Sequence, residues 1–296
     1  MHLEPFDYQR PGSLRELEGL LTRHAGQCHL LAGGTDLLVL VKEKLLSPRL
    51  VLDVGDLAEL QGIFRAPDGG LTILGGTKVS EIEASALVRE CAPALAYAAA
   101  QLGSSQVRHM ATMAGNCCHG SPSAETPPVL LAHGAEVTLS REGGERRLPI
   151  ETFWLAYRKT ALASGEYLKS FHLPALTARA AVAYRFQGLR RAMEIDMVNV
   201  GCYLELDAKK QKAAAVRIAL GAVGPIPYRA VQAEAALAGA KIGPEFFEEA
   251  GRLAAEEAKP IDDVRASASY RRRLVAVLVS RAFAACAEEL SGRKTR

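Results

Sequence analysis

The chain carries little net charge and no long apolar run. Its 36 Lys and Arg residues nearly balance its 33 Asp and Glu residues, which leaves a formal charge of +3 over 296 residues. There is no basic stripe with interleaved aromatic residues, so we expect no nucleic-acid partner. No apolar run reaches the roughly 18 residues that a membrane-spanning helix needs, so we expect no membrane span. The basic residues at 293–296 are expected to be a solvated end.

The sequence also lacks the signals of export and of disulfide bonding. Residues 1–10 contain no apolar segment of the secretory type. The cysteines are scattered and form no C-x-x-C pair: Cys28, Cys91, Cys117, Cys118, Cys202 and Cys286. A disulfide framework is therefore not expected, and we predict a reduced, cytoplasmic protein.

Common motifs of nucleotide binding and catalysis are absent. Neither G-x-G-x-x-G nor G-x-x-x-x-G-K-[ST] occurs, which argues against Rossmann and P-loop sites. The histidines have no metal-ligand spacing, so we predict no metal site and no catalytic residue of the chain's own. This profile is typical of a protein that holds a cofactor, because the cofactor then supplies the chemistry.

The length and the 49% apolar content are those of two or three domains with ordinary cores. We predict domains at 1–57, 58–176 and 177–296. In the first, Ser13 and Glu16 indicate a capping box for a helix that ends at His24. The pattern then predicts strands at 29–31 and 49–54, a helix at 37–45, and a parallel sheet.

The second and third domains differ in their expected element order. In the second, a hairpin is predicted at 62–74 and a strand at 165–173, with further strands at 135–139 and 145–148 and helices from 79, at 93–102 and at 127–133. In the third, antiparallel strands at 181–186, 196–207 and 213–223 precede helices at 230–238, 244–257 and 269–290. Strands followed by helices indicate an α+β domain.

Two short glycine segments are the most informative local features. The 31–36 loop follows a predicted strand and contains Gly33 and Gly34, and the 111–116 segment contains Gly115 and is followed by Ser121 to Glu125. Glycine permits positive φ and close approach, so consecutive N–H groups can point at one phosphate. Two such segments could hold both phosphates of a dinucleotide.

Two neighbouring features keep alternative interpretations open. Gly75-Gly76-Thr77-Lys78 repeats the pattern of Gly33-Gly34-Thr35-Asp36, and it could be a second phosphate loop or a tight strand-to-helix connection. The adjacent pair Cys117-Cys118 could indicate redox or metal chemistry, or small apolar packing beside a cofactor. Among the histidines, His119, inside the second glycine region, is the one considered as a candidate functional residue.

Four segments carry a family resemblance: 32–38 with Lys42, 106–125, 217–230 and 262–272. In this order they resemble the flavin subunits of the xanthine dehydrogenase family of molybdenum hydroxylases. Near relatives include the medium subunit of aerobic-type carbon monoxide dehydrogenase and the β subunit of 4-hydroxybenzoyl-CoA reductase. The resemblance covers nearly the full chain. Residues 126–166 contain no cysteine, unlike the cluster-bearing insertion of the reductase subunit.

The resemblance implies an α+β fold in which two α/β subdomains enclose FAD, as in the vanillyl-alcohol-oxidase type of flavin fold, followed by a C-terminal domain of antiparallel sheet and helices. It implies that the 31–36 loop, Thr112, Gly115 and Asn116 hold the pyrophosphate. Glu125 would accept hydrogen bonds from the adenosine side of FAD, and Leu168 would lie beside the flavin ring. The implied cofactor-binding residues are Leu31, Ala32, Gly33, Gly34, Thr35, Asp36, Ala111, Thr112, Ala114, Gly115, Asn116, Ser121, Glu125 and Leu168.

The chain departs from the family pattern at several positions, including Cys117-Cys118-His119, which replaces a run that is usually small and apolar. Ala114 stands where glycine is common, and Glu125 and Glu194 stand where aspartate is usual. Alanine at position 114 should fit if its φ stays negative.

The resemblance further implies an oxidoreductase subunit that passes electrons between partners and an acceptor. The implied partners are a small subunit with [2Fe-2S] clusters and a large molybdopterin-binding subunit, arranged as a dimer of heterotrimers. The alternatives are a stand-alone FAD-dependent oxidoreductase of the same fold and an assembly protein that does not bind flavin. Largely intact glycine segments argue against the last.

Overall fold

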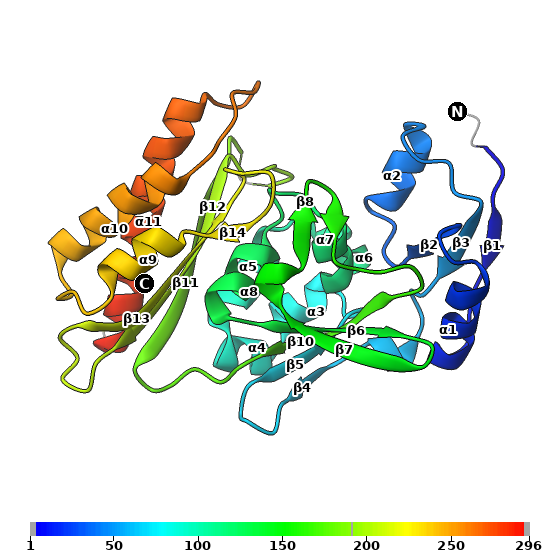
Figure 1. Ribbon diagram of the computed structural model, residues 1–296, viewed down its shortest axis with the longest axis horizontal. Helices are drawn as coiled ribbons and strands as arrows, with labels where there is room; N and C mark the ends of the chain where they lie inside the picture. The colour runs from blue at the N-terminus through cyan, green and yellow to red at the C-terminus, as the bar shows by residue number, and fades with distance from the viewer. Residues whose placement is uncertain (1–3, 191, 293–296) are drawn as a thin grey trace.

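The computed structural model describes residues 4–190 and 192–292, and the basic end at 293–296 lies outside this range. Three units follow one another along the long axis of the molecule (Figure 1). The N-terminal unit lies at one end, the central unit lies between, and the C-terminal unit lies at the other end. No helix in the described part of the chain is long and apolar enough to cross a membrane.

The N-terminal unit is a small parallel sheet with the strand order β1-β3-β2. Its elements are β1 (Asp7–Gln9), α1 (Leu14–Arg23), β2 (Cys28–Leu31), α2 (Leu37–Lys42) and β3 (Leu50–Asp53). As predicted, Ser13 caps α1, accepting a hydrogen bond from the Glu16 N–H at 3.2 Å. The predicted capping box is not completed at Ser13, because the Glu16 carboxylate accepts from the Gly12 N–H instead.

The central unit is an antiparallel sheet with the order β4-β5-β10-β6-β7. Its strands are β4 (Ile63–Arg65), β5 (Leu71–Leu74), β6 (Glu136–Arg141), β7 (Gly144–Pro149) and β10 (Tyr167–Leu173), with a separate pair β8 (Trp154–Ala156) and β9 (Lys159–Thr160). Its helices are α3 (Val79–Ala84), α4 (Ala86–Cys91), α5 (Pro93–Gln101), α6 (Ser105–Met110), α7 (Met113–Cys118) and α8 (Thr126–His133), with 3-10 turns η1 (Ala58–Leu60) and η2 (Ile150–Thr152).

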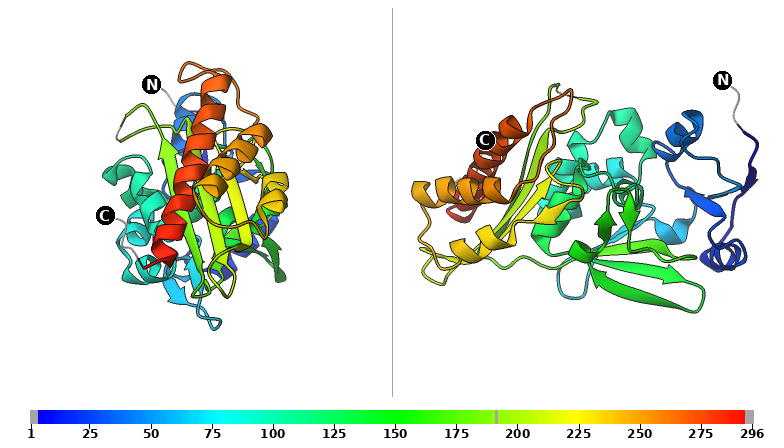
Figure 2. Two further views of the ribbon diagram at one scale, coloured as in Figure 1. Left: turned by 90° about the vertical axis from the view of Figure 1, so that its left-hand side faces the viewer. Right: turned by 45° about the horizontal axis from the view of Figure 1, so that its top comes forward.

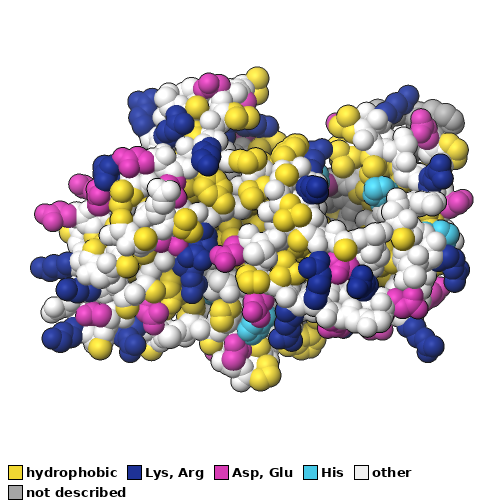
Figure 3. All heavy atoms as spheres, in the orientation of Figure 1, with side chains coloured by type: hydrophobic (Ala, Val, Ile, Leu, Met, Phe, Trp, Pro, Cys, Tyr) yellow, Lys and Arg dark blue, Asp and Glu magenta, His cyan; other side chains and the backbone are white. Residues whose placement is uncertain are grey.

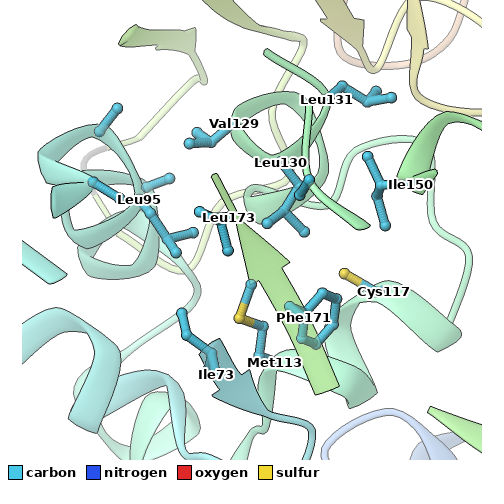
Figure 4. Close-up of a cluster of buried hydrophobic side chains, with 14 of the residues drawn as sticks. Ile73, Leu95, Met113, Cys117, Val129, Leu130, Leu131, Ile150, Phe171 and Leu173 are labelled. Carbon is cyan, nitrogen blue, oxygen red and sulfur yellow. The ribbon is translucent and has the colours of Figure 1, made fainter. Parts of the chain in front are cut away.

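The core of the central unit lies between this sheet and its helices. Ile73 and Phe171 from the sheet meet Leu95 and Leu130 from α5 and α8, and Met113 from α7 lies among them (Figure 4). Each of these five side chains is essentially inaccessible to solvent. The core therefore fixes α7, and with it the 111–116 segment, on the sheet.

The C-terminal unit pairs an antiparallel sheet with three helices on one face (Figure 2). The sheet order is β11 (Ala180–Gln187), β12 (Val198–Leu206), β13 (Ala213–Gly221) and β14 (Tyr228–Arg229). The helices are α9 (Val231–Leu237), α10 (Pro244–Glu257) and α11 (Ala268–Leu290). The other face packs on α8, where a Cβ at Gly201 would lie 2.2 Å from the Pro128 carbonyl oxygen. The predicted α+β fold is confirmed.

Candidate functional site

The 31–36 loop leaves the sheet where β2 ends. The Val54 N–H donates to the Leu31 carbonyl at 2.8 Å, and the chain then turns toward α2. Gly34 has φ +70°, a backbone conformation that residues with a side chain rarely adopt. Gly33 serves a different purpose, because a Cβ there would lie 2.0 Å from the Met110 carbonyl oxygen. One glycine makes the turn, and the other lets the loop touch the end of α6.

The backbone amides of this loop are open to a ligand. Nowhere in residues 4–190 and 192–292 is there an acceptor for the N–H groups of Ala32, Gly33, Gly34, Thr35 or Asp36. Main-chain N–H groups that lack a protein acceptor need water or a ligand instead. Consecutive donors of this kind form a concave site for an anion. The donor set therefore fits a pyrophosphate, as the sequence predicts.

The 111–116 segment differs from the expected second nest. Thr112 forms a β-bridge with Lys78 and then caps α7, accepting from the Gly115 N–H at 3.1 Å. The N–H groups of Met113 and Ala114 donate to the carbonyls of Thr77 and Gly75. Within the described chain, the Thr112 N–H is the one amide of this segment without an acceptor. Threonine three residues before Gly115 is an N-cap signal that could have revealed this helix start.

The Gly75-Gly76-Thr77 turn is a structural connection. The Gly75 N–H donates to Lys169, Gly76 to Leu60 and Thr77 to Leu74, at 2.7–3.0 Å. A Cβ at Gly75 would meet the Leu168 carbonyl oxygen at 2.4 Å. All three N–H groups donate to carbonyls within the protein, so the turn offers no phosphate nest. Of the two interpretations left open by the sequence, the tight strand-to-helix connection is the one the hydrogen bonds support.

The two predicted segments lie side by side. Gly33 abuts Met110 and Ala111, and the His119 Nε2 atom lies 3.5 Å from Asp36 Oδ1. The molecular surface is hollowed beside the N-terminal unit (Figure 3). The N-terminal and central units are also joined through Glu18, which accepts from the Tyr167 hydroxyl at 2.9 Å. Residues far apart in the sequence thus form one surface region.

The remaining predicted residues occupy different depths. Ser121 is half-buried, and its Oγ accepts from the Ser123 N–H at 3.3 Å. Glu125 is half-buried beside Asn116, whose Nδ2 lies 3.4 Å from Glu125 Oε2. Leu168 lies on β10 and belongs to the hydrophobic core, with 5% of its surface exposed. A ligand would reach its edge rather than its full side chain.

Glu125 has an unusual electrostatic environment that the sequence did not reveal. Burial, and next the nearby carboxyl of Asp196, raise the pKa of Glu125 to about 8. Burial also raises the pKa of Asp196 to about 6. Asp196 enters the site from the chain just before β12, so no local motif could have connected it with Glu125.

The Cys117-Cys118 pair has the properties of packing residues. Cys117 is fully buried, and the Trp154 indole N–H donates to its carbonyl at 2.9 Å. Burial raises the pKa of Cys117 to about 12 and also raises the pKa of Cys118. Burial likewise lowers the pKa of His119, against the opposing effect of Asp36. Protonated thiols are poor nucleophiles and poor metal ligands, which favours the packing interpretation.

Two family models together match most of the chain. The model described as "FAD binding domain in molybdopterin dehydrogenase" matches residues 4–176. The model described as "CO dehydrogenase flavoprotein C-terminal domain" matches residues 177–286.

Similar curated proteins align with this chain over nearly their whole length. The chain is 28% identical to the xanthine dehydrogenase FAD-binding subunit of Escherichia coli O157:H7, covering 97% of each chain. It is 29% identical to the carbon monoxide dehydrogenase medium chain of Hydrogenophaga pseudoflava, covering 94% of this chain and 96% of that one.

Solved structures agree with these relationships. Carbon monoxide dehydrogenase from Hydrogenophaga pseudoflava matches with a TM-score of 0.91 at 29% identity, covering 97% of this chain and 100% of the other. Quinoline 2-oxidoreductase from Pseudomonas putida 86 matches with a TM-score of 0.90 at 25% identity, covering 98% and 99%. The chain therefore belongs to the FAD-binding medium subunits of the xanthine dehydrogenase family of molybdenum enzymes, which are oxidoreductase subunits with FAD as cofactor.

Proposed function

We propose that the 31–36 loop holds the pyrophosphate of FAD. The observation that carries this proposal is the run of five amide N–H groups, from Ala32 to Asp36, that no described residue accepts. A pyrophosphate offers several anionic oxygens to such donors. Leu31 and Ala111 border this loop, and the Thr112 N–H, which also has no acceptor among the described residues, is assigned as one further donor.

The other predicted residues complete the proposed site. Gly115 is exposed and Asn116 is half-buried on α7, next to Ala114, whose N–H donates to the Gly75 carbonyl. Ser121 and Glu125 are assigned to the adenosine side. Leu168 is assigned to the edge of the flavin ring. The subdomain boundaries 1–57, 58–176 and 177–296 are part of the same proposal.

We further propose that the chain is an electron-transfer subunit of a larger complex. Bound FAD would exchange one or two electrons, while this chain holds and orients it. The proposed route leads from a large molybdopterin-binding subunit, through [2Fe-2S] clusters on a small subunit, to this chain and an external acceptor. The names of its relatives support the subunit role, because several are medium chains of dehydrogenases. A dimer of heterotrimers and a cytoplasmic location remain predictions.

The alternative is a stand-alone FAD-dependent oxidoreductase. It would require a substrate pocket and a proton-transfer residue within this chain. The full-length agreement with medium chains and FAD-binding subunits favours the complex.

Titration of the purified chain with FAD tests the proposed cofactor role. We expect one FAD per chain and quenching of flavin fluorescence on binding. Co-purification of the natively expressed protein tests the proposed partners, and we expect iron and molybdenum to accompany it. Absence of FAD binding by the folded chain would refute the cofactor site, and a metal-free active flavoenzyme would support the stand-alone alternative.

A further inference from the structure

Lys78 ends the 75–78 turn, which repeats the glycine pattern of the 31–36 loop without forming a nest. The turn is held firmly, because Thr77 is fully buried and its hydroxyl both donates to the Gly62 carbonyl at 3.0 Å and accepts from the Gly62 N–H at 3.1 Å. The first three N–H groups of the turn donate within the protein. The side chain of Lys78 is therefore the part of this turn that can contact a ligand.

Lysine is an unfavourable residue at this position. Lys78 is the N-cap of α3, where Ser, Thr, Asp or Asn would accept a hydrogen bond from a free helix N–H. A lysine side chain carries donors only, and its positive charge opposes the positive end of the helix dipole. The Lys78 side chain accordingly makes no capping bond to α3. A residue that breaks a local rule in this way is expected at a functional site.

The Lys78 side chain extends to the place where the two glycine segments meet. Lys78 pairs with Thr112 in an antiparallel β-bridge, which puts the two side chains on the same face. Its Nζ donates to the Met110 carbonyl at 3.3 Å, and a Cβ at Gly33 would lie 2.0 Å from this same oxygen. Met110 ends α6, on the side of the central unit that faces the N-terminal unit (Figure 1). The ammonium group and the 31–36 loop therefore share one contact atom.

The positive charge of Lys78 has no counter-charge within the described part of the chain. No ion pair there includes Lys78, and the Met110 carbonyl accepts from only one of its three ammonium donors. Arg108 on α6 differs, because it is paired with Glu83 at 2.6 Å. Lys78 is half-buried, so its charge has lost part of its hydration without gaining an anionic partner. Such an ammonium group is suited to an anionic ligand.

The 31–36 loop needs a cation of this kind if it holds a pyrophosphate. Its free N–H groups carry only partial positive charges, whereas a pyrophosphate carries two negative charges. Asp36, at the end of the loop, adds a further negative charge, and its Oδ1 lies 3.5 Å from His119 Nε2. Burial lowers the pKa of His119, so this histidine supplies no full positive charge at neutral pH. The ammonium group of Lys78 can supply it.

We propose that Lys78 is a further cofactor-binding residue, whose ammonium group lies beside the FAD pyrophosphate on the 31–36 loop and supplies the full positive charge that the loop lacks. This inference rests on the proposed function. The geometry that carries it is the contact of both Lys78 Nζ and Gly33 with the Met110 carbonyl. Lysine binds phosphate as a point charge with rotatable donors, so its two remaining donors can meet a phosphate oxygen.

The test is FAD titration of the full chain by flavin fluorescence, from about 0.02 M to about 0.5 M salt. Lys78→Met removes the charge and keeps the length of the side chain. We expect its FAD affinity at low salt to be about 10- to 100-fold weaker than that of wild type, as for the loss of one charge-assisted hydrogen bond. Salt screens the attraction between Lys78 and the phosphates, so wild type should lose affinity as salt rises and Lys78→Met should lose less.

Two further variants separate the charge of Lys78 from its hydrogen bond to Met110. Lys78→Arg keeps the charge and should retain most of the wild-type affinity and its salt dependence. Lys78→Gln keeps a neutral donor for the Met110 carbonyl but no charge, and it should bind like Lys78→Met. Lys241→Met removes one exposed positive charge from the C-terminal unit. It is the matched control and should follow wild type.

The outcomes separate this inference from the proposed function. If wild type binds no FAD at any salt concentration, the proposed function fails. If wild type binds FAD and Lys78→Met has the same affinity and salt dependence, the 31–36 loop holds FAD without this charge and the inference is overturned. If Lys78→Gln binds like wild type, Lys78 acts only through the Met110 carbonyl, which overturns the inference as well. If Lys78→Met fails to fold, the difference in salt dependence between Lys78→Gln and Lys78→Arg decides.

Discussion

The 31–36 loop and the 111–116 segment both contain glycine, but they differ in how many backbone N–H groups are left without an acceptor. In the first, five consecutive N–H groups lack an acceptor among the described residues. In the second, the amides of Met113, Ala114, Gly115 and Asn116 all donate within the protein. The first leaves its N–H donors available, whereas the second is a helix start whose donors are used within the protein.

The support of the two segments differs in the same way. The 31–36 loop is held through its contact with Met110 and Ala111. The 111–116 segment is anchored by Thr77 and Gly75, and the core behind it continues through α8 to the C-terminal sheet. A glycine pattern alone therefore does not identify a phosphate nest, because the partners of each N–H group decide whether it is available.

Gly33→Ala should produce the largest effect. The new Cβ would lie 2.0 Å from the Met110 carbonyl oxygen, so the loop must move away from α6 and its N–H groups lose their common direction. We expect FAD affinity to fall about 1,000-fold or more, which equals roughly 4 kcal/mol. Flavin fluorescence titration measures the loss. Gly19→Ala in α1, where no atom lies within 4 Å of the new Cβ, is the control and should bind normally.

Much of the fold could be predicted from local patterns. The helix at 244–257 was predicted with its observed bounds, because Pro244 starts it and its apolar residues follow a helical period. The three long C-terminal strands were predicted by their β-rich runs. Such features depend on residues within one element, and the sequence displays them directly.

The site could be predicted only in part. Gly33 and Gly34 were singled out from local sequence. Whether the N–H groups of the 111–116 segment are free depends on the carbonyls of Gly75 and Thr77, which belong to another turn. Asp196 is far from Glu125 in the sequence and is brought close only by the packing of the C-terminal sheet. Contacts of this kind follow from tertiary structure, for which a single sequence gives no local signal.

His133→Leu should make the fold that carries the 111–116 segment less sensitive to acid. His133 ends α8 beside the C-terminal sheet, and both ring nitrogens are buried without a partner among the described residues. Burial, and then Arg217, lower the pKa of His133 to about 4 from its ordinary value of 6.5. The unfolded chain therefore binds a proton more readily, and stability present above pH 6.5 is lost as the pH falls toward 4.

The size of this loss is about 3 kcal/mol, from roughly 1.4 kcal/mol per pH unit. The raised pKa values of Glu125 and Asp196 act in the opposite direction, because the folded state then holds their protons more tightly. The free energy of unfolding is measured with denaturant at pH 7 and pH 4 for wild type and for His133→Leu. The difference between the two proteins in their loss of stability is the contribution of the histidine. Equal acid sensitivity in both proteins would show that His133 does not titrate at this contact.

Thr112→Val should have a moderate effect, mainly on stability. The variant loses the Oγ1 acceptor of the Gly115 N–H, and an N-cap of this kind contributes about 1 kcal/mol. We expect FAD affinity to fall less than about tenfold, because the open donors lie on the other loop. Thr112→Ser keeps the cap and should restore both properties. If Thr112→Val weakens FAD binding as strongly as Gly33→Ala, the two segments contribute equally and the comparison above is wrong.

Cys118→Ala should have the smallest effect. Cys118 is half-buried at the end of α7, and burial raises the pKa of its thiol, so it acts as a small apolar side chain. We expect FAD affinity to stay within about twofold, measured by the same titration. Thiol labelling of the native protein should modify Cys118 slowly, whereas unfolded protein should react at every cysteine. Loss of FAD binding in Cys118→Ala would mean that α7 contributes side chains as well as a rigid backbone, and the second segment would then be part of the binding surface itself.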